Sequence, residues 1–127
     1  MKRILVIHDS QELLELFRTL LAEEGYDVIM YSSAIEDLRE IEQIKPELII
    51  LDILLGNREA IGWQMLEKLK LFPTTTSTPI ILCTAAVDKV REQAGYLTAR
   101  GVIVVLKPFN LDDLLASIKK ALSLQVE

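Results

Sequence analysis

The chain is poor in several residue types that mark common classes of protein. It holds one cysteine, four prolines and one histidine among 127 residues, and its aromatic content is 6%. The single cysteine, Cys83, excludes an internal disulfide framework and a zinc site built from thiolates, and it fits a reducing compartment. Neither a repeat, a charge block nor a linker-like stretch interrupts the sequence. The pattern therefore predicts one domain over residues 1–127.

Positive charge and long hydrophobic runs are also scarce. Nineteen acidic side chains face fourteen basic ones, which gives a net charge of −5. Because phosphate contacts need clustered lysine and arginine, such a chain is a poor general binder of nucleic acid. The first apolar run is only Ile4–Ile7, too short for a signal peptide or a membrane span. Half of the residues are hydrophobic, which excludes intrinsic disorder. We expect a cytoplasmic globular domain.

Five short apolar runs recur along the chain at regular spacing. Most of them are nearly unbroken in Ile, Leu and Val, which is typical of strands covered on both faces of a parallel sheet. The runs are Ile4–Ile7, Val28–Tyr31, Leu48–Leu51, Ile80–Cys83 and Val102–Leu106.

Between the runs, apolar residues recur at helical spacing. The clearest stripes are those of residues 13–21 and 111–122, and residues 63–72 carry a third. A helix capped by Ser33 and Glu36 and a weaker helix over Asp88–Ala99 complete the set, while Asn110 is placed to cap the last helix. The stretch Pro73–Pro79 is predicted to be an exposed loop.

This alternation predicts an α/β fold. Five β-then-α units with right-handed crossovers make a doubly wound (βα)5 parallel sheet with helices on both faces. We expect the flavodoxin-like strand order 2-1-3-4-5, in which ligands bind outside the carboxyl ends of the strands, where the order reverses.

Polar residues close four of the five runs, at the edge where a ligand is expected. They are Asp9, Asp52, Thr84 and Lys107. Two neighbouring carboxylates favour a divalent cation, and oxygen ligands suit Mg²⁺. An aspartate can also attack a phosphoryl group, whose oxygens a lysine and a hydroxyl then stabilise. The alternative for each residue alone is a helix cap or ordinary surface.

With these residues in place, the chain resembles the receiver domain of two-component response regulators. The resemblance rests on RILVIHDS, KPELIILDILL, TPIILCTA and VLKPFNLDDLLASI, in that order and spacing. It implies that Asp52 is the phosphoacceptor. It also implies a Mg²⁺ site formed by Asp9, Asp52 and the backbone carbonyl of Leu54, with His8 acting through a water molecule.

The same resemblance implies roles for two residues of the later strands. Thr84 corresponds to the hydroxyl switch residue, and Lys107 to the lysine that precedes a cis proline, here Pro108. Two positions depart from the family pattern. His8 replaces an acidic residue, which predicts weaker binding of Mg²⁺, and Val104 stands where an aromatic switch residue is common.

Two functional interpretations follow. In the first, the domain accepts a phosphoryl group on Asp52 from a histidine kinase or a histidine phosphotransfer protein. It then signals to a downstream protein through the face of the fourth helix, fifth strand and fifth helix. In the second, His8 and Val104 mark a pseudo-receiver that binds its partners without phosphorylation. Either way we expect a signalling domain, a monomer or weak homodimer, whose only catalysis is its own phosphotransfer and dephosphorylation. We expect no contact with nucleic acid or a membrane.

Overall fold

Five parallel strands form the centre of the computed structural model, which describes residues 2–32, 35, 37–53, 59–107 and 110–123. The strands are β1 (Arg3–Ile7), β2 (Asp27–Tyr31), β3 (Leu48–Asp52), β4 (Ile80–Thr84) and β5 (Val102–Leu106). Their order is β2-β1-β3-β4-β5, so the predicted topology is confirmed. The order reverses between β1 and β3, whose residues Ile7 and Leu51 pair in register.

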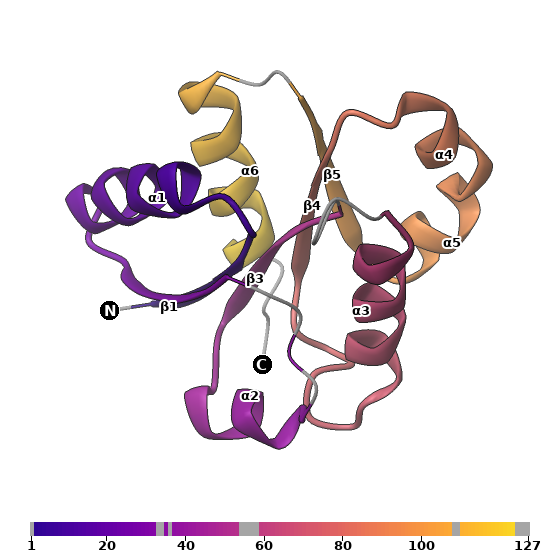
Figure 1. The fold of residues 1–127 in the computed structure, drawn as a ribbon, viewed down its shortest axis with the longest axis horizontal. Helices are drawn as coiled ribbons and strands as arrows, with labels where there is room; N and C mark the ends of the chain where they lie inside the picture. The colour runs from indigo at the N-terminus through magenta and orange to yellow at the C-terminus, as the bar shows by residue number, and fades with distance from the viewer. Residues whose placement is uncertain (1, 33–34, 36, 54–58, 108–109, 124–127) are drawn as a thin grey trace.

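Helices cover both faces of this sheet (Figure 1). On one side lie α1 (Gln11–Glu23) and α6 (Leu111–Ser123). On the other lie α2 (Arg39–Ile44), α3 (Glu59–Leu71), α4 (Val87–Glu92) and α5 (Ala94–Ala99). None of the helices in the described part of the chain is long and apolar enough to cross a membrane.

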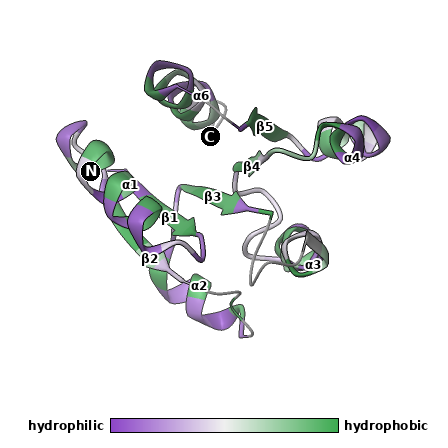
Figure 2. Ribbon diagram, turned by 45° about the horizontal axis from the view of Figure 1, so that its top comes forward, coloured by the Kyte–Doolittle hydropathy of each residue, from purple (hydrophilic) through white to green (hydrophobic). Residues whose placement is uncertain are grey.

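Alternate residues of the strands enter two separate cores. Ile4, Val6 and Ile50 pack against α1 and α6, whereas Leu5 and Leu51 pack on the side of α2 and α3. Because successive side chains of a strand point to opposite faces, unbroken apolar runs are what two covered faces require. Figure 2 shows the hydrophobic colouring concentrated on the strands and the hydrophilic colouring on the outer sides of the helices.

Helix α3 approaches the end of β3 closely, and Gly62 allows this approach. A Cβ atom at Gly62 would overlap the backbone of Ile53, including its carbonyl oxygen. Hydrogen alone fits there, so the glycine is required by packing and not by backbone conformation. The contact holds α3 against the segment that follows Asp52.

Two local predictions need correction. The helix expected over Asp88–Ala99 is two six-residue helices, because the helix is interrupted at Gln93. The loop at Pro73–Pro79 is not simply exposed: the side chain of Thr75 is buried and donates a hydrogen bond to the carbonyl oxygen of Leu69. The buried Lys70 donates to the carbonyl oxygens of Thr76 and Thr78, which gives the loop internal partners.

Of the two predicted helix caps, the structure describes one. The cap of α6 is confirmed, since the side chain of Asn110 accepts a hydrogen bond from the backbone N–H of Asp113 at 2.7 Å. The capping pair Ser33 and Glu36 lies outside the described residues, as do Leu54 and Pro108.

Candidate functional site

Asp52 is the centre of the candidate site. It is the last residue of β3, one position beyond the buried Leu51, and it is only 2% exposed. A buried carboxylate is costly unless charged or polar groups surround it. The described residues supply such groups from three strand ends.

Lys107 provides the cation. It follows β5, and its Nζ lies 2.9 Å from Oδ1 of Asp52 while its own side chain is 28% exposed. Its backbone N–H donates to the carbonyl oxygen of Thr84 at 2.8 Å, which ties the lysine to the end of β4. The pair is therefore anchored by the sheet and not by a flexible surface contact.

His8 approaches the other oxygen of Asp52. Its Nε2 lies 3.1 Å from Oδ2, and the residue is 4% exposed. Its Nδ1 accepts a hydrogen bond from the backbone N–H of Ser10 at 3.1 Å. Burial lowers the pKa of His8 below its usual value, although the negative charge of Asp52 opposes this effect. The imidazole is therefore neutral near neutral pH, and its proton resides on Nε2 because Nδ1 is the acceptor.

Asp9 completes an acidic cluster with these residues. Nδ1 of His8 lies 3.9 Å from Oδ1 of Asp9, whose side chain is 31% exposed and open to solvent. One ligand atom from each of His8, Asp9 and Asp52 can be chosen so that all three atoms lie within 4.8 Å of one another. Of these, the two carboxylates supply the hard oxygen ligands that Mg²⁺ prefers.

Thr84 joins the group at the end of β4. Its strand neighbour Cys83 pairs with Asp52 in register, and its hydroxyl oxygen accepts a hydrogen bond from the backbone N–H of Ala86 at 3.0 Å. A hydroxyl that accepts one hydrogen bond still has a hydrogen to donate. Thr84 therefore belongs to the same sheet edge as Asp52 and Lys107.

The expectation that Cys83 belongs to the core is confirmed. The residue is 1% exposed within the core beneath α1 and α6, and burial raises the pKa of its thiol to about 12. A thiol this hard to ionise is not a nucleophile.

Sequence reasoning missed the backbone groups that orient these side chains. The N–H groups of Ser10 and Ala86 hold the imidazole of His8 and the hydroxyl of Thr84. Only the position of Ser10 could have suggested such a role, because its side chain also caps α1 through the N–H of Leu13.

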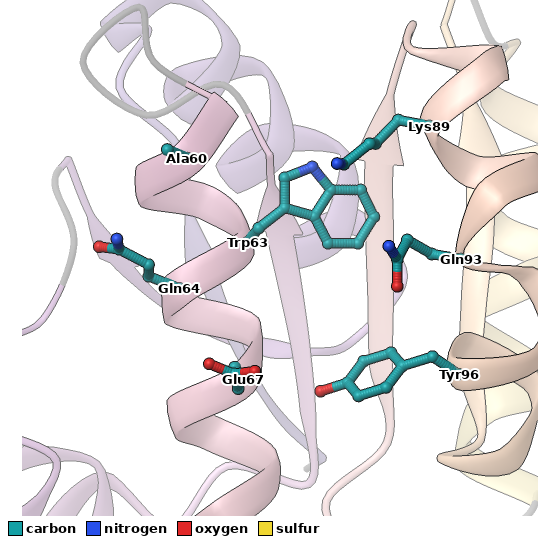
Figure 3. Close-up of a pocket in the computed structure, with 7 residues that line it drawn as sticks. All are labelled: Ala60, Trp63, Gln64, Glu67, Lys89, Gln93 and Tyr96. Carbon is teal, nitrogen blue, oxygen red and sulfur yellow. The ribbon is translucent and has the colours of Figure 1, made fainter.

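One cavity of the molecule lies away from this edge. It measures about 420 Å³, opens between α3 and the α4–α5 pair, and is lined by Trp63, Lys89 and Tyr96 among others (Figure 3). None of the predicted site residues lines it. This cavity is therefore separate from the residues that the strand ends bring together.

Comparison with known proteins agrees with this geometry. A family model described as the response regulator receiver domain matches residues 4–119. The transcriptional regulatory protein PcoR of Escherichia coli is 29% identical over 122 residues, which are 96% of this chain and 52% of PcoR. The response regulator MprA of Mycobacterium leprae is 30% identical over 94% of this chain and 50% of its own length. The chain thus spans about half the length of these curated relatives.

Solved structures of response regulators are also similar to this chain. A CheY-like response regulator receiver domain protein from Methanospirillum hungatei is 32% identical, with a TM-score of 0.80 over 98% of this chain and 96% of its own. A response regulator from Chloroflexus aurantiacus is 27% identical, with a TM-score of 0.80 over 96% of this chain and 98% of its own.

Proposed function

Because this chain belongs to the response regulator receiver domain family, we propose that Asp52 is its phosphoacceptor. The observation that carries the proposal is the pairing of a buried carboxylate with Lys107 at 2.9 Å, at the edge where the strand order reverses. The donor is the phosphohistidine of a kinase or of a phosphotransfer protein. Asp52 lies far enough inside the edge for the surrounding side chains to control what reaches it.

The reaction is a displacement at phosphorus. An oxygen of the Asp52 carboxylate attacks the phosphorus atom, a P–O bond forms, and the P–N bond of the phosphohistidine breaks. The electron pair of that bond passes to the donor imidazole, which then takes up a proton. Lys107 compensates negative charge on the phosphoryl oxygens, and the hydroxyl of Thr84, at the end of the neighbouring strand, donates a hydrogen bond to one of them.

Mg²⁺ fits two of the residues present. The carboxylates of Asp9 and Asp52 are the groups that would hold it, and the bound ion would compensate charge on the phosphoryl group. His8 contributes no carboxylate oxygen, so we expect weaker binding of Mg²⁺ than a site with a third acid would give. The predicted contribution of the Leu54 carbonyl remains a prediction.

The output face is proposed from the position of Thr84. The strand that ends at Thr84 leads into α4 and α5, which together take the place of the predicted fourth helix, while α6 is the predicted fifth helix. Both α5 and α6 contact β5, so the proposed face consists of α4, α5, β5 and α6. Phosphorylation would act there by shifting an equilibrium between two arrangements of these elements. A downstream protein that prefers one arrangement would read the shift.

Intact-protein mass spectrometry tests the proposal. The protein is incubated with Mg²⁺ and a small acyl phosphate, and we expect the addition of one phosphoryl group. Asp52→Asn should abolish the addition. The matched control is Asp88→Asn, which removes an exposed carboxylate in the first turn of α4 and should leave uptake intact. Uptake that persists in Asp52→Asn would overturn the assignment, and no uptake by the unaltered protein would favour the phosphorylation-independent interpretation.

A further inference from the structure

His8 lies beside the carboxylate of Asp52 and affects the charge of the site. Among His8, Asp9 and Asp52 it is the one residue without a carboxylate, it is buried, and it is the only histidine of the chain. Its Nε2 has no hydrogen-bond partner of good geometry in the described residues, although Oδ2 of Asp52 is only 3.1 Å away. An unsatisfied buried donor beside a carboxylate is costly, so a ligand that satisfies it is expected.

The tautomer of His8 decides which ligand that is. Nδ1 accepts from the backbone N–H of Ser10, so Nε2 carries the hydrogen. An N–H group cannot bind a metal ion through that nitrogen, because coordination requires the lone pair. The partner of Nε2–H is a hydrogen-bond acceptor, and a negatively charged oxygen makes the strongest such bond.

Two donors therefore flank Asp52 from opposite sides. Lys107 reaches Oδ1 and His8 reaches Oδ2, so a phosphoryl group on either oxygen has one donor beside it. An acid in place of His8 would repel such a group unless a cation lay between them. The histidine removes this repulsion and adds a hydrogen-bond donor.

We propose that His8 holds a phosphoryl oxygen through Nε2–H, so that phosphorylation of Asp52 depends less on a divalent cation. The inference rests on the proposed function of Asp52 and deepens it. His8 is a binding residue for the phosphoryl group in this account, and the backbone N–H of Ser10 is the positioning group that fixes its tautomer.

The first test compares the unaltered protein with His8→Asp. Initial rates of phosphoryl uptake from a small acyl phosphate are measured with saturating Mg²⁺ and with a chelator, and the ratio of the two rates is the readout. We expect the ratio to be at least about tenfold larger in His8→Asp, because the variant restores the repulsion that a cation must relieve. Mg²⁺ binding, followed through the fluorescence of the single tryptophan Trp63, should strengthen in the same variant.

The outcomes separate the two proposals. Equal ratios in both proteins, or a larger ratio in the unaltered protein, would overturn the role of His8 while leaving Asp52 as acceptor. Uptake by His8→Asp alone would also overturn it, since His8 would then be inhibitory. No uptake by either protein would contradict the proposed function itself, and this inference with it.

A second test observes His8 directly. Since the chain has one histidine, nitrogen NMR of the labelled imidazole has a single pair of signals. We expect a protonated Nε2 in the free protein, and a larger shift of Nε2 than of Nδ1 when beryllofluoride is added without Mg²⁺. Asp52→Asn should lose that shift. If Zn²⁺ instead removes the Nε2 proton and coordinates the ring, His8 is a metal ligand and the proposal fails.

Discussion

Two pairs of helices, one on each face of the sheet, are packed very differently. On one face, α1 and α6 have 13 residues each, and each buries three of them. Each also begins at a side-chain cap, which is Ser10 for α1 and Asn110 for α6. On the opposite face, α4 and α5 have six residues each, and neither has a side-chain cap. Helix α4 buries no residue and α5 buries only Leu97.

This difference follows the chemistry of the site. The well-packed α1 follows β1 directly and so fixes His8 and Asp9, which must keep their geometry around Asp52. The lightly packed α4 and α5 follow Thr84, the residue proposed to couple phosphorylation to the output face. Segments with few buried contacts open at the lowest free energy, so α4 and α5, which belong to the proposed output face, are the helices that rearrange most easily.

The largest expected effect is on local opening. In amide hydrogen exchange, amides in the middle of α1 and α6 should be protected at least about 1,000-fold more than those of α4, a difference of about 4 kcal/mol. The reason is that α4 can detach without exposing a buried side chain. Equal protection of α4 and of α1 and α6 would contradict this comparison.

Matched truncations give the next effect. Leu21→Ala removes a fully buried side chain from α1 and should lower the free energy of unfolding by about 3 kcal/mol. Leu97→Ala removes a side chain of similar burial from α5 and should cost less than about 2 kcal/mol, because a short helix can relax into the cavity. Urea unfolding of both variants measures the difference. A larger cost for Leu97→Ala would contradict the account.

Two glycines on the same face of the sheet, one in α3 and one in α5, differ in how closely other atoms approach them. Gly62→Ala forces a Cβ into the backbone of Ile53 and should destabilise the protein by about 2 kcal/mol. Gly95→Ala, in α5, meets no atom within 4 Å and should stabilise it by about 0.5 kcal/mol. Thermal unfolding of both variants checks these values. Destabilisation by Gly95→Ala would mean that other atoms pack against position 95 of α5.

The last expected effect is a pH dependence from Cys83. Its pKa is raised to about 12 from 9.0 in the unfolded chain, so the folded state binds the thiol proton more tightly. Its contribution to stability is complete below pH 9.0 and is lost as the pH rises toward 12. Relative to Cys83→Ala, the unfolding free energy of the unaltered protein should fall there by up to about 1.4 kcal/mol per pH unit. Urea titrations on both sides of pH 9.0 measure it. A constant difference would mean that water reaches the core beneath α1 and α6.

Much of the fold could be predicted from the sequence, because its determinants are local. Apolar runs located every strand, and the stripes located α1 and α6, whose packing repeats along one helix face. The break at Gln93 and the burial of Thr75 could not be predicted in this way. The side chain of Thr75 is buried because the loop folds back onto Leu69, and the apolar pattern carries no mark of the interruption at Gln93.

The sequence predicted which residues form the site, but not how their atoms are arranged. Strand ends placed Asp9, Asp52 and Lys107 at one edge, which is a matter of topology. That His8 turns Nε2 toward Asp52 depends on a hydrogen bond from the Ser10 backbone, which leaves no trace in residue type. The sequence thus identified His8 as a departure, and the structure shows which atom it offers.

The most direct test of the account is to locate the phosphoryl group chemically. After incubation with an acyl phosphate, borohydride reduces an aspartyl phosphate to homoserine, and peptide mass spectrometry then identifies the altered residue. We predict homoserine at position 52 in the unaltered protein and in Asp88→Asn. Reduction at Asp9, or at no aspartate while phosphoryl mass is added, would contradict the assignment of Asp52 as the acceptor.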